Sequence, residues 1–493
     1  MKNNFGIDYV FACAVALVAG LLSAYTAQVV GMIAVADGQG WDGSVFVRVI
    51  QEIASGHYSN SDPYRTVRTS AFPVIYVIEL FHMDVNVVPA QRAFNIALIM
   101  MSAASLYMAA RFKGVFRMHA LLSCATFLLA WCVLVVPVFT PVLTDHLVLF
   151  TSSLSLLLWA VGRRFSLGIL IFLCVWIMPT AALIPIALLM LRDGRGVSGS
   201  ATASSAGVEI FSVAMGLGLL ILVYVSMGGT LFEGVETHSY DFDRNQGADL
   251  TGSSKMLPLS IFIVVVMLWV AMRSLIYFIR SNWNNFSVPW MLFGLCVAAL
   301  SFAVMRISID FNTGFSSSQL FSHITKQALS APFKAWVSHF AYFGPVVIVV
   351  YYFVIFRRSA QIPAALAGCL IGFLPLLALG SESRQWISIF PVIAMASAFV
   401  PLSIAARVAM LVSTALMLWG IWHLNQEVTA AVVENVGLQH PLWHRYFGRV
   451  GPWMTMGVYY HWLVVCGVVA AVIFGADRLQ RARSLGSSDR SLS

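Results

Sequence analysis

Long apolar runs recur along almost the whole chain, and they constrain its fold more than any other feature. Only 10% of the 493 residues are charged, whereas 59% are hydrophobic. A soluble domain carries roughly 25% charged residues, so the sequence excludes a soluble enzyme, a secreted domain and a disordered protein. An all-α, polytopic membrane protein is the predicted fold class. Runs long enough for a membrane-spanning helix, about 20 residues, lie near residues 9–35, 90–111, 119–139, 144–161, 207–228, 256–279, 287–305, 337–356, 362–380, 386–401, 403–422 and 456–475.

Residues 166–191 can form either one kinked span or a hairpin of two short segments. Pro179 and Pro185 interrupt this stretch, and a proline inside a helix removes a hydrogen bond, so we expect a break near Met178. The charge distribution favours the hairpin. With residue 1 inside, the inner segments then hold 17 of the 29 basic residues and 5 of the 21 acidic ones, as the positive-inside rule requires.

The topology that follows has about 12 to 14 membrane segments, and we expect fourteen, with both termini cytoplasmic. Residues 1–493 form a single transmembrane domain in this interpretation, with a long first outer loop at 36–89 and a basic cytoplasmic tail at 476–493. The basic inner face accounts for the net charge of +8. Membrane lipids are therefore expected partners, and nucleic acid is not.

No sequence motif indicates a bound metal or nucleotide. The seven cysteines lie within apolar runs without metal-ligand spacing, and P-loop, dinucleotide-binding and HExxH motifs are absent from the sequence. The outer loops 229–255 and 423–455 contain several His, Asp and Glu residues at irregular spacing. We therefore predict no metal site, and no cofactor is certain.

The first outer loop contains an amphipathic helix that begins near Asp42. Gly56 is expected to end this helix, and the helix is expected to lie along the membrane surface. Asp42 would then stand at its N-terminus, where the helix dipole favours a carboxylate. Asp42 could also serve only as part of an N-terminal Asp-Gly-Ser cap. The apolar stripe at helical spacing consists of Val45, Phe46, Val49, Ile50 and Ile53.

The same loop continues with Arg65 and Arg68, two arginines three residues apart. Such a pair can hold a phosphate or a carboxylate, although contact with lipid headgroups is an equally good explanation. The apolar segment 72–83 is short and contains Glu79. Counting it as a span would break the charge rule, so we expect a second interfacial or re-entrant helix there.

Two further outer turns carry charged residues at the membrane boundary. Asp145 and His146 lie between two apolar spans, where an acid beside an imidazole is costly unless it is paired or faces a polar cavity. A helix cap explains Asp145 alone. Glu382 and Arg384 lie in another short turn. They can form a mutual structural ion pair, or Arg384 can bind an anionic group that Glu382 helps to orient.

In the order and sidedness of these residues the chain resembles integral-membrane glycosyltransferases of the GT-C superfold, which use polyprenyl-phosphate-linked sugars as donors. The matching positions are Asp42 in Trp41-Asp42-Gly43, Arg68 with Pro73, and Asp145 in Thr144-Asp145-His146. Glu382-Ser383-Arg384 resembles the Glu-x-Arg part of a longer mannosyltransferase motif. Gly380 and Ser381 replace the His-Lys of that motif and Gln385 its Phe, which leaves the sugar open. The resemblance covers the topology of the whole chain.

The resemblance implies an inverting sugar transfer from a polyprenyl-phosphate-linked donor to a lipid, glycan or protein acceptor on the periplasmic face of a bacterial inner membrane. Asp42 is then the general base, and Asp145 is the second catalytic carboxylate, which with His146 positions a substrate. Arg384, followed by Arg68 and Arg65, would stabilise the departing phosphate. Glu382 would orient the bound group.

Two other classes of function remain open at this point. A transporter or flippase of a lipid-linked or anionic substrate would keep polar residues at the bilayer midplane and show repeats with broken helices. A polysaccharide polymerase or ligase would concentrate arginines in a large outer loop, for which only Arg445 and Arg449 provide a hint.

Overall fold

The computed structural model describes residues 5–58, 63–192, 206–226, 229, 252–309, 325–326, 328–356, 361–434, 441–451 and 454–490. Within these residues the regular structure is helical, apart from one isolated bridge between Leu191 and Phe286. Many positions of the predicted outer loops 229–255, 306–336 and 423–455, and the basic residues Arg195, Arg357 and Arg358, lie outside the described residues.

In the described part of the chain, seven helices are long and apolar enough to cross a membrane. This confirms a multi-pass helical membrane protein, because about 20 helical residues span the 30 Å of a hydrocarbon core. Each of these helices overlaps one of the predicted runs. They are α1 (Phe5–Val30), α5 (Val87–Phe112), α12 (Ala206–Ser226), α13 (Gly252–Asn282), α14 (Val288–Ser308), α20 (Ile404–Val433) and α22 (Met456–Arg490).

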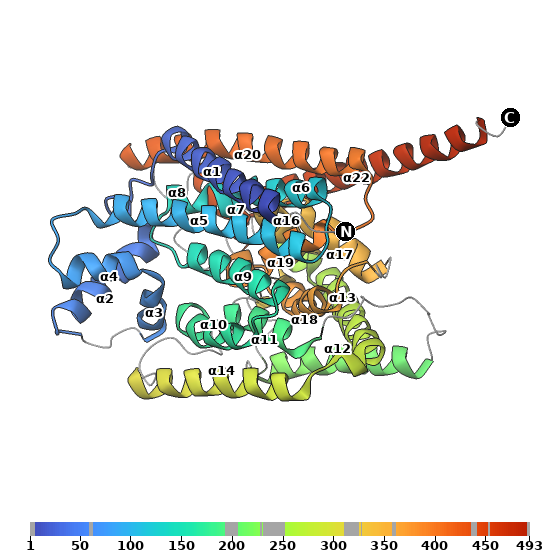
Figure 1. The fold of residues 1–493 in the computed structure, drawn as a ribbon, viewed down its shortest axis with the longest axis horizontal. Helices are drawn as coiled ribbons and strands as arrows, with labels where there is room; N and C mark the ends of the chain where they lie inside the picture. Colours follow the sequence, from blue (N-terminus) through green and yellow to red (C-terminus); the bar gives the residue numbers. More distant parts are fainter. Residues whose placement is uncertain are drawn as a thin grey trace.

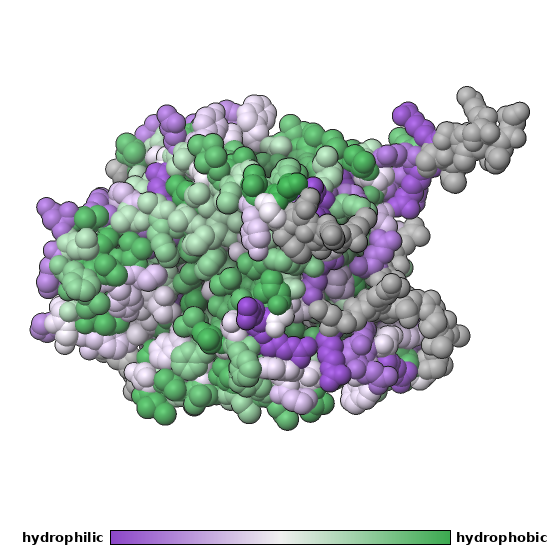
Figure 2. Space-filling view, in the orientation of Figure 1, coloured by the Kyte–Doolittle hydropathy of each residue, from purple (hydrophilic) through white to green (hydrophobic). Residues whose placement is uncertain are grey.

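The exposed faces of these long helices are apolar. Val10 and Leu21 of α1, Leu222 of α12 and Val464 of α22 each expose more than half of their surface. Apolar side chains cover much of the middle of the face in Figure 2, and hydrophilic residues are more frequent toward its left and right ends. Such a belt is stable against lipid and not against water.

Shorter or broken helices fill the space between the long ones. Three predicted continuous spans are wrong as single helices: residues 119–139 bend by 72° after Leu128, residues 337–356 break at Gly344, and residues 386–401 begin as a 3₁₀ helix. Pro345 cannot continue the α-helical hydrogen bonding. The pieces are α6 (Arg117–Leu128), α7 (Trp131–Leu134), α8 (Val136–Phe139), α16 (Lys334–Phe343), α17 (Val346–Phe356), η5 (Ser383–Ile389) and α19 (Phe390–Ser397). The predicted run 362–380 forms one unbroken short helix, α18 (Ala364–Leu379).

These interrupted helices are buried by protein rather than by lipid. Tyr342, Phe343 and Phe390, for example, are completely buried. Irregular backbone at membrane depth is tolerated where protein surrounds it. The sequence missed the breaks because hydropathy alone does not distinguish a lipid-facing span from a buried one.

Residues 164–190 form two α-helices with a short 3₁₀ helix between them, and the predicted break lies at Met178. Met178 has extended backbone angles and separates α10 (Arg164–Ile177) from η2 (Pro179–Ala182) and α11 (Leu183–Met190). α10 and α11 pack against each other, and each also packs against α9 (Asp145–Ala160) and α14. This arrangement favours the hairpin over one kinked span.

The first loop forms a small helical layer at one end of the bundle. It consists of α2 (Gly40–Ala54), α3 (Pro63–Arg68), η1 (Thr69–Ala71) and α4 (Pro73–Leu80). In Figure 1 this layer lies at the left, whereas the N-terminal end of α1 and the C-terminal end of α22 lie toward the right. The predicted helices at 42–55 and 72–83 are thus present, and the two ends of the described chain lie at the opposite end of the bundle from them.

Candidate functional site

The first turn of α2 carries Asp42, but not as a cap. α2 begins at Gly40, its N-cap residue is Gln39, and no side-chain capping bond is present there. The Ser44 hydroxyl instead donates to the carbonyl oxygen of Trp41, at 2.9 Å. The predicted Asp-Gly-Ser cap is therefore wrong, because the helix starts two residues earlier than the polar residues indicated. Gly56, with a φ of 72°, follows the end of α2 as predicted.

Gly43 allows α2 to approach the turn before α9 closely. A Cβ at position 43 would lie 2.8 Å from Cβ of Val142 and 2.9 Å from its carbonyl oxygen. Any larger residue would push the first turn of α2 away from this backbone. Asp42 is the neighbour of Gly43, so this contact fixes the distance of its carboxylate from Asp145 at the start of α9.

Asp145 is the first residue of α9 and is almost completely buried, with 1% of its surface exposed. The side chain of Thr144, the N-cap residue, makes no capping bond. The Tyr342 hydroxyl donates to Oδ2 of Asp145 at 3.0 Å, and Nε of Arg384 donates to the same oxygen at 3.2 Å. A buried carboxylate needs such partners, so Asp145 is held firmly from α16 on one side and from η5 on the other.

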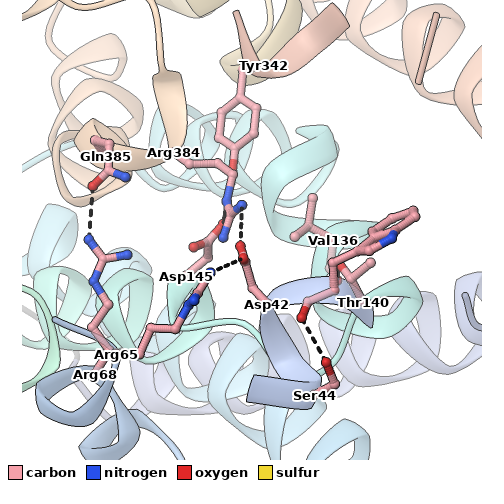
Figure 3. Close-up of polar contacts among 11 residues, drawn as sticks. Asp42, Ser44, Arg65, Arg68, Val136, Thr140, Asp145, Tyr342, Arg384 and Gln385 are labelled. Carbon is pink, nitrogen blue, oxygen red and sulfur yellow. Dashed lines mark hydrogen bonds and ion pairs between the residues drawn. The ribbon is translucent and has the colours of Figure 1, made fainter. Parts of the chain in front are cut away.

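Arg384 joins the two aspartates. Its Nη1 lies 3.6 Å from Oδ2 of Asp42, and Nη2 of Arg65 lies 3.6 Å from the other Asp42 oxygen. Figure 3 shows the Arg384 side chain between Asp145 and Asp42, with Tyr342 beside it. We call Asp42, Arg65, Asp145, Tyr342 and Arg384 the Asp42 cluster. It unites residues from α2, α3, α9, α16 and η5 that are far apart in the sequence.

The electrostatics of the cluster hold Arg384 charged. Burial lowers the pKa of its guanidinium, but the carboxylates of Asp145 and Asp42 raise it, and the net shift is upward. The two aspartates differ in their access to solvent: 45% of the Asp42 side chain is exposed, against 2% of the Asp145 side chain. Asp42 is therefore the carboxylate that a substrate can reach.

Arg68 and Glu382 lie beside this cluster. Nη2 of Arg68 donates to the side-chain Oε1 of Gln385 at 3.1 Å, and the Thr180 hydroxyl donates to the backbone carbonyl oxygen of Gln385 at 3.0 Å. Burial raises the pKa of the Glu382 carboxyl, while the charges of Arg384 and Arg68 oppose the rise. Among the described residues, the ion pairs of Arg384 are with the two aspartates. Glu382 makes no direct ion pair with Arg384 in the described part of the chain, although the charges of the two residues act on each other.

His146 follows Asp145 but faces into packed protein. It is 2% exposed, and neither ring nitrogen has a hydrogen-bond partner among the described residues. Its ring nitrogens therefore make no hydrogen bond to Asp42 or Arg384. Its proposed part in positioning a substrate rests on its proximity to Asp145 alone.

A buried histidine that the sequence did not single out holds the turn that carries Arg384. Nδ1 of His339 lies 2.9 Å from the Ser383 hydroxyl, and Nε2 lies 3.1 Å from the Leu377 carbonyl oxygen. Since a carbonyl only accepts, Nε2 carries the proton and Nδ1 accepts from Ser383. This pair of bonds fixes the neighbour of Arg384 against α16 and the end of α18.

Sequence reasoning also missed Tyr342 and Gln385. Tyr342 lies in an apolar run and nothing in its surroundings sets it apart from a core aromatic residue. Gln385 directly follows the Glu-x-Arg motif, which is the one signal that could have found it. Both contribute bonds to residues more than 190 positions away.

No group of three or more His, Cys, Asp or Glu side chains within the described ranges is arranged to hold a metal ion. His238, Asp241 and His440, which lie in the loops considered for metal binding, are outside the described residues. The cluster thus offers two carboxylates of unequal exposure and a fixed guanidinium. These groups can accept a proton and stabilise negative charge.

No known protein-family model and no curated protein matches this sequence.

Proposed function

We propose that this protein is a membrane glycosyltransferase of the GT-C type, which transfers a sugar from a polyprenyl-phosphate-linked donor to an acceptor hydroxyl with inversion. The observation that carries the proposal is the Asp42 cluster. It combines one reachable carboxylate, one buried carboxylate and a shared arginine at the end of the bundle that holds α2, α3 and α4.

Asp42 is the proposed general base. The acceptor oxygen attacks the anomeric carbon of the sugar, the bond from that carbon to the phosphate oxygen breaks, and polyprenyl phosphate leaves with the bonding electrons. The proton of the acceptor hydroxyl passes to Asp42. A base has to reach its proton, and the side chain of Asp42 is 45% exposed. The 3.6 Å distances to its two arginines are longer than direct hydrogen bonds, so its oxygens remain able to accept.

Asp145 is the proposed second carboxylate of the site, and its action is on Arg384. Both of its described partners bind Oδ2, and its burial keeps it from the acceptor. It holds the guanidinium in one orientation, and charge on the departing phosphate is then stabilised by Arg384 together with Arg68 and Arg65. Glu382 and His146 complete the substrate-binding set in this proposal.

The topology belongs to the same proposal. We infer about 12 to 14 membrane segments, if the short helices α9, α10, α11, α17 and α18 also cross part of the bilayer. Basic residues lie at the end of α5, the start of α10 and the end of α22. They favour a cytoplasmic location for the end of the bundle opposite α2, α3 and α4. The Asp42 cluster then faces the periplasm, and a bacterial inner membrane is the proposed location.

The direct test uses the full-length protein in proteoliposomes with a panel of polyprenyl-phosphate sugars and a membrane lipid and glycan extract as acceptor. We expect one donor to be consumed, with release of free polyprenyl phosphate and a product heavier by a single sugar in mass spectra. The anomeric configuration of the product, measured by NMR, should be inverted. Nucleotide sugars, as matched donors without the lipid, should not react.

Other outcomes separate the alternative functions. Movement of the intact lipid-linked substrate between leaflets, without release of polyprenyl phosphate, would replace the proposal by a transporter or flippase. A ladder of products that differ by repeating units, or transfer of a whole glycan, would indicate a polymerase or ligase.

A further inference from the structure

A second arginine near the Asp42 cluster is buried without an anionic partner. Arg449 lies in η6 (Gly448–Val450), between α21 (Pro441–Phe447) and α22, and is 5% exposed. Its Nε and Nη1 atoms have no hydrogen-bond partner among the described residues, and no described carboxylate lies within 4.0 Å of the guanidinium. Burial lowers the pKa of Arg449 from its usual value, because desolvation disfavours the charged form.

Aromatic rings surround this guanidinium. Its carbon lies 5.4 Å from the ring centre of Trp131 and 5.6 Å from that of Trp462. Cation–π contacts stabilise a charge only in part, and they leave the N–H donors in the plane of the guanidinium group unused. Each unsatisfied buried group in a native structure calls for an explanation. For an arginine with idle donors, an anion that binds between the rings is a chemical explanation.

Arg449 is close to the Asp42 cluster but separate from it. The ring of Trp131, which faces Arg449, lies 5.1 Å from the ring of Tyr342, whose hydroxyl binds Asp145. Tyr446 is near enough to both Arg449 and Arg384 for each positive charge to act on the pKa of its hydroxyl. Trp131 and Tyr446, whose ring centres lie 6.3 Å apart, thus link Arg449 to the surroundings of Arg384.

The backbone of this segment is tied to the turn that carries Arg384. Gly451 has a φ of 81°, and a Cβ at this position would overlap the carbonyl oxygen of Ser381. Only glycine fits there without displacement. The spacing between Arg449 and Arg384 is therefore set by a direct contact of the two segments.

Charge balance distinguishes the two arginines. Arg384 is shared by two carboxylates, whereas Arg449 has none in the described part of the chain. We propose that Arg449 forms a second anion-binding subsite that takes a phosphate group between Trp131 and Trp462. The phosphate can belong to a lipid or to a soluble group, and both have the same chemistry for a guanidinium. The inference concerns binding and does not require Asp42 to be a base.

The test compares Arg449→Gln with Arg445→Gln in full-length protein in phosphatidylcholine nanodiscs. Arg445 is a matched control because it lies in the adjacent α21, is 60% exposed and pairs with Glu427. The probes are undecaprenyl phosphate and inorganic phosphate, and the readouts are the shift in Tm with probe concentration and the derived Kd. We expect Arg449→Gln to weaken binding of one probe at least about tenfold and Arg445→Gln to leave both unchanged.

The two probes separate the sources of the phosphate. If Arg449→Gln loses binding of undecaprenyl phosphate alone, the subsite takes a lipid-linked phosphate. If it loses binding of both probes, the subsite takes a phosphate group whether or not a lipid is attached. Unchanged binding of both probes in Arg449→Gln would overturn the proposal.

The stability of the probe-free protein gives an independent readout. Removal of an unpaired buried charge should leave Tm unchanged or raise it, whereas a structural role for Arg449 predicts a lower Tm. If Arg449→Gln does not fold, Arg449→Lys keeps the charge, loses the planar set of donors and should show the same weakened binding. Sugar transfer by the wild type is measured on the same preparation, so a failed glycosyltransferase proposal would show as absent sugar transfer with wild-type phosphate binding intact.

Discussion

Two clusters of carboxylates and arginines occupy opposite ends of this molecule, and they are built differently. We call Asp8, Tyr107, Arg111 and Arg117 the Asp8 cluster. Asp8 is completely buried, and Nε of Arg111 and of Arg117 lie 2.9 Å and 2.8 Å from its Oδ1. In the Asp42 cluster the corresponding contacts of Asp42 are 3.6 Å long, and the carboxylate is about half exposed.

The difference separates a structural ion pair from a candidate reaction site. Asp8 in α1 is bound by Arg111 of α5 and by Arg117, the first residue of α6, so it joins three regular helices through close contacts. Asp42 sits among short or interrupted elements, with partners from a six-residue helix and a 3₁₀ turn. Close burial fixes a structure, whereas a reachable carboxylate with longer contacts can exchange partners with a substrate.

The sharpest way to break this comparison is Asp42→Asn. We expect the rate of sugar transfer to fall by about 100-fold to 10,000-fold, because a neutral amide cannot take up the proton of the acceptor hydroxyl. Tm should stay near that of the wild type, since Asp42 is partly solvated. Transfer of radiolabelled sugar from the lipid-linked donor measures the rate, and an Asp42→Asn protein with wild-type activity would remove Asp42 from the chemistry.

The opposite pattern is expected for Asp8→Asn. Loss of the buried charge leaves two arginines without their partner, which should destabilise the fold by about 3 kcal/mol. Thermal unfolding in detergent or nanodiscs measures this effect. Activity per folded molecule should match the wild type, and a loss of activity at unchanged Tm would contradict the structural role of the Asp8 cluster.

Arg384→Lys sharpens the comparison within the Asp42 cluster. Lysine keeps the positive charge but cannot contact Asp42 and Asp145 together in the arginine geometry. We expect kcat to fall roughly tenfold to 100-fold through misplacement of charge at the phosphate. Arg111→Lys in the Asp8 cluster is the matched control, and it should change Tm more than kcat. Equal effects of both variants on kcat would show that the two clusters do not differ in function.

Gly43→Ala should have the smallest effect. The added Cβ would press on Val142, and relief of that contact should cost about 1 kcal/mol of stability. Because the shift moves Asp42, we expect kcat to fall severalfold while KM for the donor changes little. Steady-state kinetics check this. A severalfold rise in KM with unchanged kcat would place the Gly43 contact at donor binding instead.

Much of the fold followed from local patterns, whereas the site followed only in part. The helix at Asp42 was predictable from its apolar spacing and Gly56, and the break at Met178 from the prolines around it. The start of α2 was predicted two residues late, because Asp42 and Ser44 resemble capping residues but bind elsewhere. Local sequence could not show that Tyr342 and Arg384 meet at Asp145, since those contacts arise from the packing of α9, α16 and η5.

One experiment tests the central claim most directly: release of free polyprenyl phosphate from a labelled lipid-linked sugar by wild type, Asp42→Asn and Asp8→Asn, each normalised to folded protein. The account predicts release by wild type and by Asp8→Asn at equal rates, and release at least about 100-fold slower by Asp42→Asn. Release by Asp42→Asn at the wild-type rate would contradict it, as would wild-type protein that releases no polyprenyl phosphate from any donor.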